Sequence, residues 1–229
     1  MNNYSVTKSN NLIDASYKLN VQAQKLVLAC LSKVDSRKAI PKEISITALE
    51  FSELMGIEHN AHRELYKAAD ALFKSSITLV DNNEEVELYW VQKKVKKLKG
   101  QGKVTLVWSD DVLKYISQLR SRFTSYKLRD IADLQSSHSI RLYELIMRFN
   151  DTNIRKISLE DFKAALGISD KYEQYKDLNK WVIKPALKEL GKKLDIEVTT
   201  LKTGRKITAL YFTFSDKKEV QQELDLQQR

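Results

Sequence analysis

The sequence has very few of the residues that interrupt or cross-link a chain. Its 229 residues include one cysteine, two prolines and six glycines. The single cysteine, Cys30, cannot form an intramolecular disulfide, and its place in the apolar run LVLACL predicts a buried thiol in a reducing compartment. Because proline and glycine are scarce, no low-complexity linker is visible, and a junction between domains must be short.

Long apolar segments are missing too. No run approaches the roughly 20 residues of a membrane span, and the polar start MNNYSVTKSNN is unlike a signal peptide. We therefore expect a cytoplasmic protein with no membrane partner. The chain length and the 42% hydrophobic content suit one or two domains with ordinary cores, and we expect two.

The residue patterns of several enzyme classes are also absent. His59 and His62 have no evident third metal ligand nearby. The chain lacks the two histidines, one residue apart, of a rolling-circle nicking enzyme, and neither Gly-Lys pair is followed by the Ser or Thr of a phosphate-binding loop. We expect a protein that is not an enzyme and uses no cofactor or metal. Tyr126 and Tyr143 are expected to be packing residues.

Positive charge is in excess. Lysine and arginine number 39 against 30 aspartates and glutamates, which gives a formal net charge of +9 and a pI near 9.4. This balance points to nucleic acid, to another acidic surface, or to a basic protein without an anionic partner.

An internal repeat organises the chain. ITALEFSELMGI at 46–57 aligns without gaps with ISLEDFKAALGI at 157–168. In each copy a Thr or Ser caps a helix, an acidic residue three positions later completes a capping-box pattern, and Gly-Ile ends the helix. An apolar helix is expected before each copy, and a basic or mixed helix and a pair of strands after it.

This order of elements is typical of a winged helix, and it occurs twice. EVELYWVQ and KVTLVWS are the expected strands around the lysine-rich segment 93–102. LDIEVTTL and ITALYFTF are those around 202–206, where Gly204 supplies the positive φ of a tight turn. We therefore predict an α+β fold of two tandem winged-helix domains, each a helix-turn-helix with a β-hairpin wing. The predicted bounds are 1–130, 131–214 and, for a polar tail, 215–229.

The segment YEQYKDLNKWVIKPALKELGKK, 172–193, falls at the recognition-helix position of the second copy. Helical spacing places Lys176, Lys180 and Lys184 on one side, where like charges repel unless an anionic partner is bound. Pro185 predicts a kink. A solvated lysine face on a core-packed helix is the alternative. The expected core face consists of Leu178, Trp181, Val182, Pro185 and Ala186.

Over nearly its whole length the sequence resembles the theta-type plasmid replication initiators that bind repeated origin sequences, the iteron-binding family. The segments that carry the resemblance are NLIDASYKLNVQAQKLVLACL, FTSYKLRDIADLQSSHSIRLYELIMRF and YKDLNKWVIKPALKEL with GRKITALYFTF. The resemblance implies binding of origin repeats in double-stranded DNA and recruitment of the host replication initiator and helicase. It also implies a dimer that represses its own promoter and a monomer active at the repeats.

The resemblance assigns DNA contacts by position to the second copy. Arg and Lys can donate to guanine or to phosphate, and Asn179 can pair with adenine; the wing cations are expected to bind phosphate. The expected contacts are Lys171, Tyr172, Lys176, Asn179, Lys180 and Lys184 on the helix, and Lys202, Thr203, Arg205 and Lys206 on the wing. The first wing adds a stretch of six lysines in eleven residues, which are Lys93, Lys94, Lys96, Lys97, Lys99 and Lys103. We interpret this stretch as a phosphate clamp, and a merely solvated flexible wing is the alternative.

The first copy is expected to mediate self-association. Its third helix carries Glu64 and Asp70 and has no lysine stripe, so it is poorly adapted to a major groove. Its strand EVELYWVQ alternates Val86, Leu88 and Trp90, and an exposed edge there could pair across a two-fold axis. Two other functions stay open, a transcriptional repressor without an initiation role and an adaptor that binds protein. Tandem direct repeats beside the gene favour initiation, and a lone palindrome favours repression.

Overall fold

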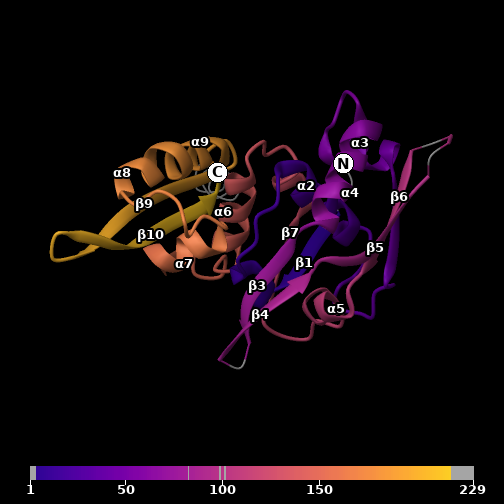
Figure 1. The fold of residues 1–229 in the computed structure, drawn as a ribbon. Coiled ribbons are helices and arrows are strands. Elements are labelled where there is room, and N and C mark those ends of the chain that lie inside the picture. The colour runs from indigo at the N-terminus through magenta and orange to yellow at the C-terminus, as the bar shows by residue number, and fades with distance from the viewer. Residues whose placement is uncertain (1–3, 82, 98, 101, 218–229) are drawn as a thin grey trace, which may run out of the picture. The chain divides into compact units, whose positions relative to one another are not determined.

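The structure is a computed structural model that describes residues 4–81, 83–97, 99–100 and 102–217. They form two compact units that divide between Ser137 and His138 (Figure 1). The predicted boundary, after residue 130, falls at the end of the 3-10 turn η1 (Leu128–Asp130). Of the predicted polar tail, residues 218–229 lie outside the described residues.

The first unit alternates helices and strands. Its helices are α1 (Asn10–Asp14), α2 (Val21–Ser32), α3 (Ala48–Met55), α4 (Ala61–Phe73) and α5 (Asp110–Ile116). Its strands are β1 (Ser5–Ser9), β2 (Glu43–Thr47), β3 (Ser76–Asp81), β4 (Glu84–Tyr89), β5 (Val91–Lys96), β6 (Lys103–Trp108) and β7 (Phe123–Lys127). The winged helix consists of α2, α3 and α4 with the sheet β2-β6-β5, and the hairpin β3-β4 is inserted between α4 and the wing.

The core of the first unit is built on α2. Its residues from Ala23 to Ser32 are buried, among them the apolar run LVLACL in which a buried Cys30 is predicted. Cys30 is fully buried, and desolvation raises the pKa of its thiol to about 12, so the group stays protonated. Tyr126 packs in the same unit and is buried, as expected.

Helix α3 begins and ends as the repeat predicts. The Thr47 hydroxyl accepts from the Glu50 amide, and the Glu50 carboxylate accepts from the Thr47 amide at 2.7 Å, which completes a capping box. Gly56 has φ +61°, and the Ile57 amide donates to the Ser52 carbonyl at 3.1 Å. The left-handed residue closes the helix because glycine adopts this φ without a steric penalty.

The predicted strand EVELYWVQ is divided into two strands. Trp90 is fully buried at a bend, with β4 before it and β5 after it, and a bulge follows between Val91 and Lys93. Strand β4 pairs with β3, and β5 pairs with β6. Much of the lysine-rich segment is therefore strand. Of the alternating residues Val86, Leu88 and Trp90, the last two are core side chains, so they do not face solvent at an exposed strand edge.

The second unit repeats the winged-helix order. Its helices are α6 (Ser137–Met147), α7 (Leu159–Ala165), α8 (Tyr175–Leu178), the π-helical turn η2 (Asn179–Ile183) and α9 (Lys184–Leu190). Its strands are β8 (Ile154–Ser158), β9 (Leu194–Thr203) and β10 (Lys206–Asp216), in the order β8-β10-β9. The sheet of the first unit has the same connectivity, since its first strand β2 also pairs with its last strand β6. The predicted α+β fold of two tandem winged helices is confirmed.

Polar side chains connect the elements of the second unit. Arg141 and Glu144 are buried and form an ion pair at 2.8 Å, and the Arg141 guanidinium donates to the Ala165 carbonyl at 3.0 and 3.1 Å. These bonds tie α6 to α7. Burial lowers the pKa of Arg155 to about 10, and its guanidinium donates to the Leu145 carbonyl at 2.6 Å. Tyr143 is buried in this core, as predicted.

Candidate nucleic-acid interface

The lysine-bearing segment of the second unit is a continuous helical stretch, α8–η2–α9. Lys176, Lys180 and Lys184 are all exposed, and so are Lys188 and Lys192 farther along. Within the described part of the chain, none of the first three forms an ion pair with an acidic residue. These three ammonium groups are therefore available to an anionic ligand.

The proline does not produce a simple kink. Pro185 is the second residue of α9, and the turn before it, η2, has the wider π-helical form. This turn changes the phase of the segment. Trp181 is 58% exposed and Pro185 is exposed, whereas Ile183 is buried. The prediction that Trp181 and Pro185 pack on the core is wrong, because it assumed an unbroken α-helical spacing.

The start of the recognition segment also differs from the prediction. Helix α8 begins at Tyr175, so Lys171 and Tyr172 lie in the turn that precedes it. Tyr172 has φ +53°, an uncommon left-handed conformation for an aromatic residue. The Lys171 amide donates to the Ile168 carbonyl at 3.0 Å. Asn179 is the first residue of η2 and is half-buried.

The second wing is the hairpin β9-β10, which extends well beyond the helices of its unit (Figure 1). Gly204 has φ +61° in the turn between the strands, as predicted. A contact at 3.1 Å joins the Thr203 and Thr208 hydroxyls across the hairpin. The expected contact residues at its end are all exposed: Lys202, Thr203, Arg205 and Lys206.

The first wing is organised differently, because α4 contributes an acidic side chain to it. Asp70 forms ion pairs with Lys94 and with Lys96, the latter at 2.5 Å. The two hydrogen bonds hold the pKa of the Asp70 carboxyl below its ordinary value. The ammonium of Lys94 lies 4.8 Å from the ring centroid of Phe73. These two lysines are only 20% and 23% exposed, so they are occupied within the unit.

Further contacts fix this wing on α4. The Tyr66 hydroxyl donates to the Lys97 carbonyl, and its ring lies 5.2 Å from the Lys96 ammonium. His62 packs on Tyr66 at 4.3 Å between ring centroids. Its imidazole also lies so close to Gly102 that a Cβ there would approach within 2.0 Å. Glycine at this position permits the close approach of wing and helix.

The remaining lysines of the first wing are on its outside. Lys93, Lys97, Lys99 and Lys103 are exposed. Successive side chains of a strand point to opposite faces, which explains why some of these lysines are exposed and others are not. Along β5, Lys94 and Lys96 point toward α4, and Lys93 and Val95 point away. The sequence brings six lysines together, and the structure makes four of them accessible.

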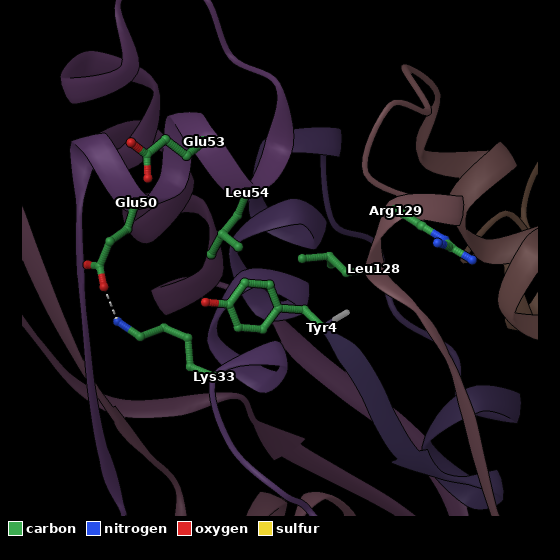
Figure 2. Close-up of a pocket in the computed structure, with 7 residues that line it drawn as sticks. All are labelled: Tyr4, Lys33, Glu50, Glu53, Leu54, Leu128 and Arg129. Atoms are coloured by element: carbon green, nitrogen blue, oxygen red, sulfur yellow. Dashed lines mark hydrogen bonds and ion pairs between the residues drawn. The ribbon is translucent and has the colours of Figure 1, made fainter. Parts of the chain in front are cut away.

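A pocket of about 340 Å³ lies in the first unit, near the start of the chain (Figure 2). The Tyr4 ring lies in the middle of the labelled residues, and Arg129 extends away from it. Glu50 is not free to act as a base, since one oxygen binds Lys33 at 2.5 Å and the other caps α3. Among the described residues, no group of three His, Cys, Asp or Glu could hold a metal ion. The lining residues are Tyr4, Lys33, Glu50, Glu53, Leu54, Leu128 and Arg129.

Two residues of the interface were missed by the sequence reasoning. The sequence places Trp181 in the core, and the π-helical turn that exposes it has no signal in the neighbouring residues. Asp70 was noted as unfavourable to groove binding, but its two lysine partners follow only from the pairing of β5 beside α4.

The fold defines the class, a protein of two tandem winged-helix domains. A family model described as "Initiator Replication protein, WH1" matches residues 5–147, and one described as "Initiator Rep protein, WH2" matches residues 158–214. The chain therefore belongs to the family of initiator replication proteins, as the resemblance indicated.

Individual relatives are more distant. The chain is 28% identical over 238 residues to a replication initiation protein of Escherichia coli, an alignment that covers 99% of this chain and 73% of the relative. It is 28% identical over 101 residues to a probable replication protein of Bifidobacterium longum (strain NCC 2705), covering 44% of this chain and 34% of that one. The crystal structure of the Pi initiator protein in complex with iteron DNA matches 95% of this chain and 100% of that chain, with a TM-score of 0.80 and 23% identity. At this identity the match is one of fold.

Proposed function

We propose that this chain is a plasmid replication initiator that binds repeated origin sequences, iterons, in double-stranded DNA. The observation that carries the proposal is the exposed cationic surface of α8–η2–α9 and the β9-β10 wing, in a member of the initiator family. A similar fold in the Pi initiator is described in complex with iteron DNA. Support for the role of the second unit comes from its three unpaired lysines.

The two parts of this surface have different tasks. The recognition segment lies in the major groove, where Asn179 can pair with adenine and the lysines can reach guanine or phosphate. The wing lies along the backbone, where Lys202, Arg205 and Lys206 bind phosphate and position the segment without reading sequence. In the first unit, the four outward lysines bind phosphate.

Selection of DNA from a randomised pool by the full chain tests the proposal. We expect one enriched sequence, recurring beside the gene as direct repeats about two helical turns apart, ~20 base pairs. A chain that enriches no sequence contradicts the proposal. If the enriched sequence occurs beside the gene only as a lone palindrome, the second candidate, a winged-helix transcriptional repressor without an initiation role, is the better conclusion.

We also propose a monomer–dimer equilibrium that resides in the first unit, with the monomer active at the repeats and the dimer repressing its own promoter. Support comes from the hairpin β3-β4, because β4 has no strand partner on its other side within the described residues. Val80 and Tyr89 on this hairpin are 71% and 62% exposed. Sedimentation at rising concentration should show a dimer that Val80→Lys with Tyr89→Lys disrupts, whereas Trp181→Lys in the second unit should not. The reverse result contradicts the assignment.

Three further functional statements are proposals. The bound chain opens the origin and recruits the host replication initiator and helicase, it has no catalytic activity of its own, and it works in the cytoplasm. The described residues contain no helix long and apolar enough to cross a bilayer. Origin melting by permanganate footprinting and pull-down of the two purified host proteins test the first statement. Assays for DNA nicking and ATP hydrolysis test the second, and cell fractionation tests the third.

A further inference from the structure

An aromatic side chain is exposed in the middle of the recognition segment. The chain has three tryptophans; Trp90 and Trp108 are fully buried, whereas Trp181 is 58% exposed. Tryptophan carries the largest apolar surface of any side chain and is enriched among the residues that dominate binding interfaces. An exposed tryptophan on a candidate binding surface is therefore a candidate contact residue.

The backbone holds Trp181 in this outward position. Its neighbours Val182 and Ile183 are both buried, and the three residues belong to the π-helical turn η2. Burial of these two consecutive side chains anchors the turn to the core of the unit, while the Trp181 side chain faces solvent. Turns of π-helical form occur frequently at functional sites.

The surroundings of the indole are mainly cationic. The ammonium of Lys180 lies 4.4 Å from its ring centroid, and Lys184, three residues on, is exposed. Asp177, four residues before Trp181, is the acidic neighbour and is half-buried. A ring with one ammonium group against it and a second exposed lysine three residues on fits a polyanion that also presents apolar groups, and it fits a basic protein surface poorly.

We infer that Trp181 contacts base edges in the major groove and that its indole covers the methyl group of a thymine. The inference rests on the proposed function and adds a residue that reads sequence. The thymine methyl is the apolar group that the major groove presents, and apolar side chains recognise it by contact. Lys180, which lies against the ring, and the exposed Lys184 would bind phosphate and thereby hold the indole over the bases.

Tryptophan fluorescence tests burial of this residue. Because the other two tryptophans are inaccessible, acrylamide quenching of the full chain, excited where tyrosine does not absorb, reports Trp181. The probe is a duplex enriched by the full chain from a randomised pool. We expect quenching of the accessible component in the free protein and its loss on the duplex. An indole that stays quenchable in the complex overturns the inference.

Replacing thymine by deoxyuracil tests the methyl contact. At one thymine position of the duplex, loss of the methyl should weaken binding about fourfold, equivalent to about 0.8 kcal/mol for a buried carbon. Trp181→Ala should bind the duplex roughly tenfold more weakly and become insensitive to the replacement. Trp181→Phe keeps an apolar ring and should retain the sensitivity. The control Ile154→Ala, also exposed and in the same unit, should behave as wild type.

The outcomes separate this inference from the proposed function. A chain that enriches no sequence overturns both. A chain that enriches a sequence while Trp181→Ala weakens selected and random duplexes equally, with unchanged sensitivity to deoxyuracil, overturns the base contact alone. Trp181→Ala that binds DNA as wild type but fails to bind the purified host replication proteins assigns the indole to a protein partner and likewise overturns it.

Discussion

The two winged helices share a topology and differ in how their cations are used. In the first, Asp70 of α4 binds Lys94 and Lys96, and the wing is packed on the helix. In the second, Lys176, Lys180 and Lys184 lie on the exposed side of the helical segment, and the wing extends away from it. A lysine-rich sequence therefore does not by itself indicate an available positive surface, because an acidic residue on a neighbouring element can neutralise it.

This difference makes the second unit the expected source of affinity and specificity. Replacing Lys176, Lys180 and Lys184 together by Gln should weaken binding to the selected duplex by roughly two orders of magnitude. Each lost phosphate contact should also lower the slope of log affinity against log salt by about 0.9. Filter binding across salt concentrations measures both quantities.

The matched control removes three other exposed lysines, Lys18, Lys38 and Lys74, by the same substitution. The net charge falls equally, so a similar loss in the control would mean that overall charge, and not this segment, drives binding. That result would remove the functional distinction between the units.

Within the first wing, neighbouring lysines should respond in opposite ways. Lys93→Gln with Lys97→Gln removes two outward cations and should weaken binding to selected and random DNA alike, with a salt slope lower by about 1.8. Lys94→Gln with Lys96→Gln removes the same charge from the inward side. It should leave the slope unchanged and lower the thermal stability, because Asp70 loses its partners. Equal salt slopes for the two variants would contradict the assignment of outward lysines to DNA and inward lysines to Asp70.

Asp70→Asn should make the inward lysines of the first wing available to DNA, as the cations of the second wing are. The substitution keeps the shape of the side chain and releases Lys94 and Lys96. We expect severalfold tighter binding to random DNA and a salt slope higher by up to about 1.8. Asp111→Asn, an exposed residue paired with Lys114 on α5, changes the net charge equally and serves as the control. An Asp70→Asn variant indistinguishable from that control would show that the two lysines are not held back from DNA.

The sequence predicts the repeated fold well because local signals are strong. The capping pair Thr47 and Glu50 and the positive φ of Gly204 are read from a few neighbouring residues. The two wing hairpins also follow from the repeat, whereas the third strand of each sheet, β2 and β8, is not predicted. Their alternating residues, such as Ile44 and Ile46, give the signal.

The details of the interface were harder to predict, for two physical reasons. A π-helical turn changes the spacing on which helical patterns depend, which displaced Trp181 from its expected face. The pairing of Asp70 with Lys94 and Lys96 joins residues more than twenty positions apart, and it depends on how β5 packs beside α4. Neither feature has a local sequence signal.

The smallest predicted effect is a pH dependence of the stability of the second unit. His138 is the second residue of α6, and burial, followed by the positive charge of Lys171, lowers the pKa of its imidazole. The folded unit therefore disfavours the protonated ring, while the unfolded chain binds the proton at its ordinary pKa near 6.5. Stability should be fully present above that value and should fall as the pH decreases through it.

Thermal unfolding of the full chain between pH 7.5 and 5.5 measures this effect. His138→Gln should show a smaller decrease in melting temperature than wild type, because a proton-binding difference between folded and unfolded states is removed. His59→Gln, at an exposed loop position in the first unit, is the control and should keep the wild-type dependence. Lys171→Gln should shift the imidazole titration, followed by NMR, to higher pH, since a neighbouring positive charge is lost. An imidazole that titrates identically in wild type and in Lys171→Gln would show that the lysine does not act on it.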